Sequence, residues 1–127
     1  MNHSLIEKWH SLVNEAGQNE LSMLLADEVT FHSPVVHTPQ IGKEVTEKYL
    51  TAAFKVLVND TFSYVREIAG ESEAMLEFEV TLDGIAVNGV DIITWDENNK
   101  IVDFKVMIRP LKAIDIVRDR MMQELQK

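Results

Sequence analysis

Apolar residues recur at helical spacing in two long segments of the first half of the chain. In residues 4–17, Ser4 is a plausible N-cap, Gly17 is placed to end the helix, and the inward stripe consists of Leu5, Ile6, Trp9, Leu12 and Val13. Residues 42–57 predict a second long helix, with an inward stripe of Val45, Tyr49, Ala53 and Val56 or Leu57. Between them we expect a short helical turn over residues 19–26 and, over residues 28–42, a short strand followed by an irregular loop with two prolines.

The period of the pattern changes to two after residue 60. Strands are predicted over residues 61–69, 73–82, 85–95 and 100–108, separated by the turn sequences GES, DG and DENNK. In the second of these strands one face is apolar and the other is largely polar, and the apolar face consists of Ala74, Leu76, Phe78, Val80 and Leu82. Pro110 can open a last helix, whose apolar stripe is Leu111, Ile114, Val117, Met121 and Leu125.

Helices followed by a run of antiparallel strands predict an α+β fold, with the helices on one face of an antiparallel sheet. The length of 127 residues and the apolar content of 46% fit one compact domain that spans residues 1–127. A long curved sheet folded around helices leaves a pocket that is closed at its bottom. Clefts of this kind are where small-ligand sites usually form.

The charge balance narrows the classes of partner. The formal net charge of −9 works against binding to nucleic acid or to an anionic membrane surface. No apolar run approaches the roughly 20 residues of a membrane span, and the first ten residues lack the features of a signal peptide, so we expect a soluble cytoplasmic protein. The absence of cysteine excludes disulfides, thiolate chemistry and cysteine zinc sites. Without a glycine-rich phosphate loop or a metal-ligand cluster, no cofactor and no metal is expected.

Asp91 is the main candidate for a functional residue. It interrupts an apolar strand between Val90 and Ile92, and an unpaired carboxylate is costly to bury. One interpretation makes it the polar group of an apolar pocket, with Gly89, on the same face of the strand, leaving room for a ligand. The other interpretation is structural: Asp91 caps or pairs internally, or faces solvent at a bend.

The order of these elements, together with the segments FHSPV and GKE and the stretch GVDIITWDENNKI, resembles the SnoaL-like branch of the nuclear transport factor 2-like superfamily. That superfamily includes ketosteroid isomerases, limonene epoxide hydrolases and polyketide cyclases. The resemblance covers residues 5–110 and implies a cone-shaped barrel of a curved antiparallel sheet wrapped around helices, with an apolar cavity. It also implies a homodimer formed through the outer face of the sheet.

The resemblance implies a role for Asp91, because ketosteroid isomerases carry at the matching position a protonated Asp that donates a hydrogen bond to a substrate oxyanion. The general base of those enzymes is an Asp where this chain has Ser33, and their tyrosine on the first helix has no match, since the nearest aromatic residue is Trp9. Epoxide hydrolases of the superfamily have an Arg where this chain has Gly89. Neither reaction therefore carries over.

Other residues are candidates for the same pocket. His32 is a candidate base beside Asp91, and His37 a weaker one, although both fit ordinary loop positions. The residues predicted to bind the ligand are Trp9, Tyr49, Tyr64, Gly89, Trp95 and Met107. Aromatic and Met residues pack a core more often than they contact a ligand.

Three functions stay open at this point. The first is an isomerase-, cyclase- or hydrolase-like enzyme that acts without a cofactor on an apolar carbonyl-bearing molecule, with Asp91 as acid. The second is a module that binds such a molecule without turnover. The third is a protein-association domain that uses the outer face of the sheet and the last helix, where Met121, Met122 and Leu125 could grip a partner.

Overall fold

The computed structural model describes residues 4–14 and 20–126 of the chain. These residues form four helices and six strands, in the order α1 (Ser4–Asn14), α2 (Leu21–Leu24), β1 (Leu25–His32), β2 (Gln40–Ile41), α3 (Lys43–Leu57), β3 (Ser63–Ala69), β4 (Glu73–Leu82), β5 (Ile85–Trp95), β6 (Ile101–Arg109) and α4 (Leu111–Leu125). The long helices and the four strands of the second half thus form where the hydrophobic pattern predicts them. The expected helix stop at Gly17 lies outside the described residues.

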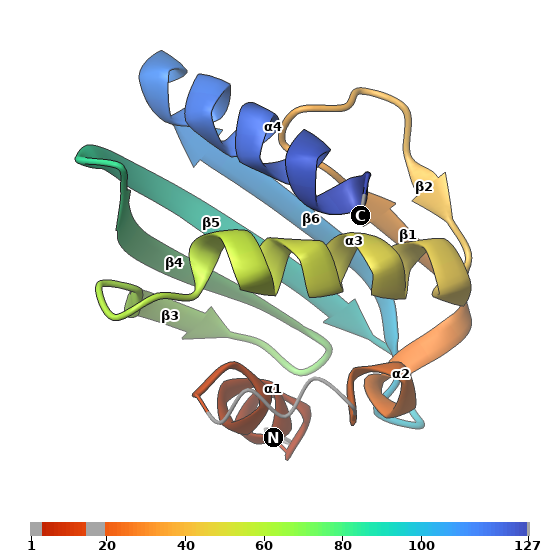
Figure 1. Cartoon of the computed structure of the whole chain (residues 1–127). Coiled ribbons are helices and arrows are strands. Elements are labelled where there is room, and N and C mark those ends of the chain that lie inside the picture. The colour runs from red at the N-terminus through yellow and green to blue at the C-terminus, as the bar shows by residue number, and fades with distance from the viewer. Residues whose placement is uncertain (1–3, 15–19, 127) are drawn as a thin grey trace.

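A single curved sheet contains all six strands in the order β2-β1-β6-β5-β4-β3 (Figure 1). Strands β3 to β6 form the predicted antiparallel meander. Strand β1 pairs with β6 in parallel, so the sheet is mixed, whereas the sequence predicted an antiparallel sheet. The cause is the connection: the chain leaves β1 through β2 and α3 before the meander begins, and β6 returns beside β1 in the same direction. The α+β class itself is confirmed.

Helix α3 crosses one face of the sheet with α4 beside it, and α1 lies near β3 (Figure 1). The opposite face of the sheet carries no helix in this view. The pleat explains which strand residues meet the helices, because successive side chains of a strand point to opposite faces. In β4 the buried residues are the predicted ones, Ala74, Leu76, Phe78, Val80 and Leu82. In β5 they are Val87, Gly89, Asp91, Ile93 and Trp95.

The predicted stripe of α3 is shifted by one residue in the structure. The buried side chains are Thr46, Leu50, Ala52, Phe54, Val56 and Leu57, while Val45, Tyr49 and Ala53 are only partly buried. Because α3 packs against β1 on one side and α4 on another, a wider arc of the helix is covered than a single stripe predicts. In α4 the predicted Val117 and Met121 are buried, but Leu111 is exposed.

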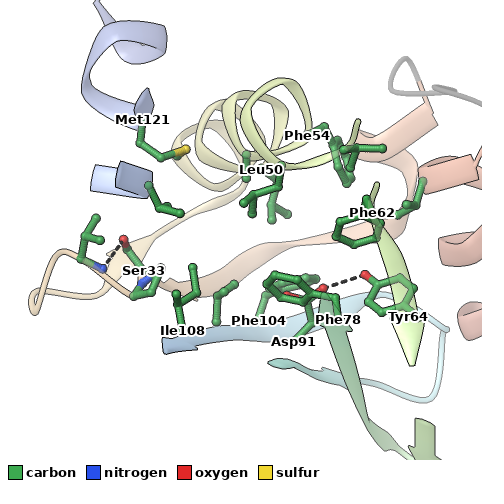
Figure 2. A pocket seen from close by; sticks show the side chains of 18 of the residues that line it. Ser33, Leu50, Phe54, Phe62, Tyr64, Phe78, Asp91, Phe104, Ile108 and Met121 are labelled. Atoms are coloured by element: carbon green, nitrogen blue, oxygen red, sulfur yellow. Dashed lines mark hydrogen bonds between the residues drawn. The ribbon is translucent and has the colours of Figure 1, made fainter. Parts of the chain in front are cut away.

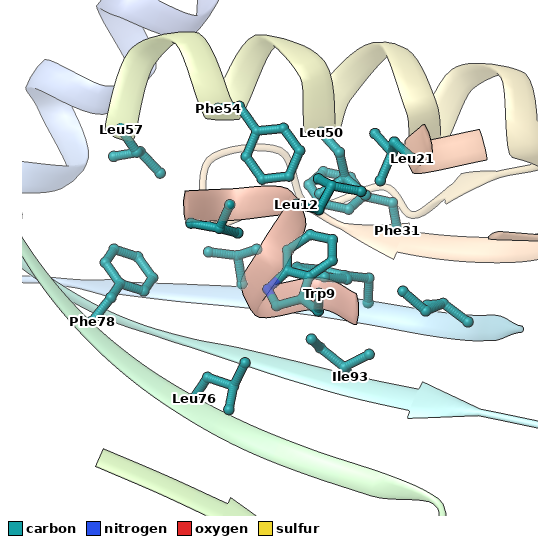
Figure 3. Packing of buried hydrophobic residues seen from close by; sticks show 14 of the residues in the cluster. Trp9, Leu12, Leu21, Phe31, Leu50, Phe54, Leu57, Leu76, Phe78 and Ile93 are labelled. Carbon is teal, nitrogen blue, oxygen red and sulfur yellow. The ribbon is translucent and has the colours of Figure 1, made fainter. Parts of the chain in front are cut away.

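The core fills the space between the helices and the concave face of the sheet (Figure 3). Trp9 of α1 lies at its centre, with its ring centroid 5.4 Å from that of Phe54 on α3 and 5.0 Å from that of Phe104 on β6. One side chain from the first helix therefore joins the helical layer to the sheet. Among the helices of the described residues, none combines the length and the apolar character that a membrane crossing needs.

Candidate functional site

A cavity of about 50 Å³ lies between α3 and α4 on one side and the sheet on the other (Figure 2). Its walls are almost entirely apolar. The polar groups among its lining residues are the hydroxyl of Ser33, the hydroxyl of Tyr64, the carboxyl of Asp91 and the indole N–H of Trp9. The enclosed space is several times smaller than the roughly 300–1,000 Å³ of clefts that hold drug-sized ligands. In this conformation the cavity suits a molecule of a few heavy atoms.

Asp91 reaches the cavity because the alternation of β5 points it to the helical side of the sheet, two positions after Gly89. Its side chain is buried, with 7% of the residue exposed. Burial raises the pKa of Asp91 from 3.8 to about 7, because an ionised carboxylate loses its water there, and the hydrogen bond from Tyr64 lowers it in part. At neutral pH the neutral and ionised forms of Asp91 are therefore present in comparable amounts.

A chain of two hydrogen bonds holds the carboxyl in place. The Tyr64 hydroxyl on β3 donates to Asp91 Oδ2 over 2.6 Å, and the Trp9 indole Nε1 on α1 donates to the Tyr64 oxygen over 3.0 Å. Burial and the neighbouring Asp91 carboxylate raise the pKa of Tyr64 well above its usual 10.0, so this hydroxyl stays protonated. Tyr64 thus acts as a fixed donor, and its direction is set by Trp9.

The second carboxyl oxygen, Oδ1, has no hydrogen-bond partner within residues 4–14 and 20–126. This oxygen is the one available to a ligand. In the neutral form it can donate a proton or a hydrogen bond to an oxygen of the ligand, and in the ionised form it can accept one. The arrangement is a single carboxyl in an apolar cavity, with Oδ2 held by Tyr64 and Oδ1 open to a ligand.

Three aromatic rings surround this acid. Phe62 stacks on Phe78 with a centroid separation of 5.4 Å, and Tyr64 meets Phe62 edge to face at 5.1 Å. Figure 2 shows Phe62, Phe78 and Tyr64 on the Asp91 side of the cavity, whereas Ser33 lies on the opposite side near Ile108. The Ser33 oxygen accepts a hydrogen bond from the backbone N–H of Val35 over 3.1 Å, which holds the loop that closes that end.

The structure brings three of the sequence-predicted site residues together, namely Asp91, Tyr64 and Trp9. It does not bring His32 to them. His32 follows Phe31 on β1, and since Phe31 points into the core, His32 points to the other face, where its Nε2 lies 2.9 Å from Asp103 Oδ1. Among the residues that the structure describes, no side chain beside Asp91 can therefore act as the base that the sequence analysis expected of His32.

The remaining predicted residues also lie outside the cavity lining. Tyr49 is partly buried on α3, with its ring 5.6 Å from that of Phe31, and Trp95 is a core residue at the end of β5. Met107 is 48% exposed on the outer face of the sheet. Gly89 has the predicted inward direction, but the space beside it is filled by the Phe78 ring instead of being left to a ligand.

Sequence reasoning named Phe78 as an inward residue without assigning it to the site, and it did not name Phe62. The alternation of β4 was the available signal for Phe78. Phe62 lies one residue before β3 begins but inside the strand predicted over residues 61–69, and its parity, which is that of Tyr64, was the available signal. Within the described ranges, no group of three or more His, Cys, Asp or Glu side chains is arranged to hold a metal ion.

Comparisons with known proteins identify a matching family and several similar structures. Residues 6–104 match the SnoaL-like domain. The crystal structure of a steroid delta-isomerase from Pseudomonas aeruginosa is 30% identical, covers 97% of this chain and 90% of its own, and superposes with a TM-score of 0.92. A cystatin-like protein from Silicibacter pomeroyi is 28% identical over 95% of this chain and 84% of its own, with a TM-score of 0.87.

A de novo designed protein with a curved sheet shares the fold alone, at 15% identity over 94% of this chain and 98% of its own, with a TM-score of 0.70. Among curated proteins none matches the chain.

Proposed function

Because this chain belongs to the SnoaL-like domain family, whose members include isomerases and cyclases, we propose that it binds a small apolar carbonyl compound and acts on it as a cofactor-free acid catalyst. Asp91 is the acid. The observation that carries the proposal is the Asp91 carboxyl in the apolar cavity, held at Oδ2 by Tyr64 and open at Oδ1. The similarity to a steroid delta-isomerase supports a carbonyl-bearing ligand class, although the cavity as it stands suits a smaller molecule than a steroid.

The chemistry follows from the two carboxyl oxygens. Neutral Asp91 donates from Oδ1 to the carbonyl oxygen of the ligand, while Tyr64 keeps its hydrogen bond to Oδ2. As negative charge develops on the ligand oxygen, the proton moves toward it, and Tyr64 stabilises the carboxylate that Asp91 becomes. The apolar walls exclude water, which strengthens both hydrogen bonds.

Binding without turnover is the second candidate function, and the residue at position 33 favours it. Removing a proton from carbon needs a base in addition to the acid. Ser33 has no titratable group suited to that task, and Asp91 is the only carboxyl among the lining residues that the structure describes. Turnover therefore needs a base that the ligand itself supplies, and a ligand without such a group is bound but not converted.

The proposal is tested by binding small ketones and lactones to the protein at pH 6 and pH 8. With a pKa of about 7, about nine-tenths of Asp91 is neutral at pH 6 and about one-tenth at pH 8, so affinity should fall about tenfold between them. Calorimetric titration measures the affinity, and deuterium uptake next to the carbonyl, followed by NMR in heavy water, measures turnover. Equal affinity at both pH values would count against Asp91 as the donor. Binding with no deuterium uptake would assign the chain to the second function.

We also propose a homodimer formed through the outer face of the sheet. Ile68, Met75 and Met107 are 61%, 42% and 48% exposed there, and a groove between them is bordered by the ion pair of Arg66 with Glu77. A two-fold axis through this groove would bury these apolar side chains against those of the second copy.

The dimer is expected to dissociate when Met107 is replaced with Glu, because the new charge would have to be buried in the interface. Sedimentation at micromolar concentration should give a dimer for the unchanged protein and a monomer for Met107→Glu. Ile41→Glu, at a residue that is 73% exposed on the edge strand β2, is the control and should stay dimeric. A monomer for the unchanged protein would contradict the proposal.

A further inference from the structure

Gly89 and Phe78 form a tight contact on the helical side of the sheet. The two residues are paired across the antiparallel strands β5 and β4. A Cβ atom at position 89 would lie 2.8 Å from Phe78 Cε2 and from the backbone oxygen of Met107, and closer still to Phe78 Cζ. The phenyl ring therefore lies over Gly89, in the place that any other side chain at this position would occupy.

This contact fixes the position of the Phe78 ring relative to Asp91. Asp91 follows Gly89 by two positions on the same face of β5, so the two are about 7 Å apart along the strand. Phe78 lines the cavity next to Asp91, and Phe62 stacks on it at 5.4 Å (Figure 2). The ring thus fills the part of the cavity floor that adjoins the acid, and its position is fixed from below by Gly89 and from the side by Phe62.

We propose that Phe78, seated on Gly89, is the specificity-determining residue that limits the length of the ligand bound at Asp91. The inference rests on the proposed function and names the size class of the ligand: compounds that are short on the side of the carbonyl that faces Phe78. A ligand with a longer chain meets the ring, and the ring cannot retreat, because the β5 backbone lies directly beneath it. Shortening this side chain opens the floor down to Gly89.

The first experiment measures two ligand series against Phe78→Leu. One series is the alkan-2-ones from butanone to nonan-2-one, and the other is benzene with its linear alkyl derivatives, which contain no carbonyl. For the unchanged protein, affinity should stop rising at a short chain length in both series. In Phe78→Leu it should continue to rise by about fourfold for each further buried methylene. The longest ligands should then bind at least tenfold tighter than to the unchanged protein.

Phe31→Leu is the matched control for a general loosening of the core. Phe31 is 1% exposed, as Phe78 is, but it does not line the cavity. This variant should keep the chain-length limit of the unchanged protein. If Phe78→Leu keeps that limit as well, or if Phe31→Leu relaxes it equally, the proposal is overturned.

The two series also separate this inference from the proposed function. If alkylbenzenes show the limit and its relaxation while ketones do not bind at any pH, the size filter stands and carbonyl recognition by Asp91 is wrong. If ketones bind with the expected pH dependence but chain length has the same effect in both proteins, Asp91 stands and the size filter is wrong.

Gly89→Ala supplies an independent readout from the opposite side of the contact. The added methyl group should push the Phe78 ring into the cavity and weaken binding of the short ketones at least tenfold. Phe78→Leu in the same chain should restore part of that loss, since the leucine does not reach position 89, while the backbone oxygen of Met107 remains close. If the double variant recovers no affinity, the proposed contact of the Phe78 ring with Gly89 does not control binding. If Gly89→Ala does not fold, the chain-length comparison between the unchanged protein and Phe78→Leu tests the proposal.

Discussion

Replacing Asp91 with Asn is expected to lower turnover at least a hundredfold while making the folded protein more stable above pH 7. The loss of turnover follows because an amide cannot transfer the proton, and general acid catalysis contributes about 10²–10⁴ in rate. The gain in stability follows because the amide has no charge to bury. A carboxyl whose pKa is raised by burial destabilises the fold once it is ionised.

The direction of the pH effect is set by the two pKa values. The pKa of Asp91 is about 7 in the folded protein and near 3.8 without its surroundings, so between these values the folded state binds more protons than the unfolded state. The free energy of unfolding contributed by Asp91 is therefore greatest below pH 4, falls as the pH rises to 7, and is constant above it. Each pH unit corresponds to about 1.4 kcal/mol, so Asp91→Asn could gain about 4 kcal/mol at pH 8 relative to pH 3.

Urea denaturation at pH 5 and pH 8 measures the part of this change that falls between pH 5 and pH 7, about 3 kcal/mol, and ketone titration at the same pH values measures binding. Asp91→Asn should bind ketones with the same affinity at both pH values, because its amide N–H can still donate. Asp103→Asn is the matched control, since Asp103 pairs with His32 on the other face of the sheet and should change neither quantity by much. A variant at position 91 that is less stable than the unchanged protein at pH 8 would show that Asp91 has an ionised structural role.

The hydrophobic pattern was sufficient to predict the four strands of the meander, and in β4 its alternation specifies the buried face as well. In β5 apolar residues occupy both faces, so the pattern left the direction of Asp91 open, and the pairing of β5 with β4 places Asp91 opposite the buried Leu76. The pattern could not specify the parallel pairing of β1 with β6. That pairing depends on where the chain returns after β2, helix α3 and the three preceding strands of the meander, which no local periodicity encodes.

The partners of Asp91 were harder to predict than Asp91 itself. Tyr64 is 27 residues away in the sequence and Trp9 is 55 residues from Tyr64, so their hydrogen bonds depend on how α1 is placed against β3. The register between β3 and β4 is irregular between Tyr64 and Arg66, which makes alternation a poor guide to the direction of Tyr64. The position of His32 has a different cause: β1 extends as far as residue 32, and its alternation points His32 to the face opposite Phe31, where it pairs with Asp103.

Replacing Tyr64 with Phe is expected to have the second largest effect. It should lower the stability of the folded protein at high pH, whereas Asp91→Asn should raise it. The hydroxyl donates to Asp91 Oδ2 and lowers the pKa of the carboxyl, so its removal should raise that pKa above 7. Ketone binding should then persist to higher pH than in the unchanged protein. Above pH 8 the buried carboxylate has lost its donor, and the free energy of unfolding should fall by about 1.5–3 kcal/mol.

Below pH 6 the same variant should lose less stability, because neutral Asp91 depends less on the donor, although the Trp9 indole N–H also loses its acceptor. The pH dependence of ketone affinity and of urea denaturation measures both effects. Tyr49→Phe is the matched control, since Tyr49 packs on Phe31 outside the cavity and should not move the midpoint of the binding profile. A midpoint that shifts to lower pH in Tyr64→Phe would mean that the hydroxyl stabilises the neutral carboxyl, and the direction of donation from Tyr64 to Asp91 would then be reversed.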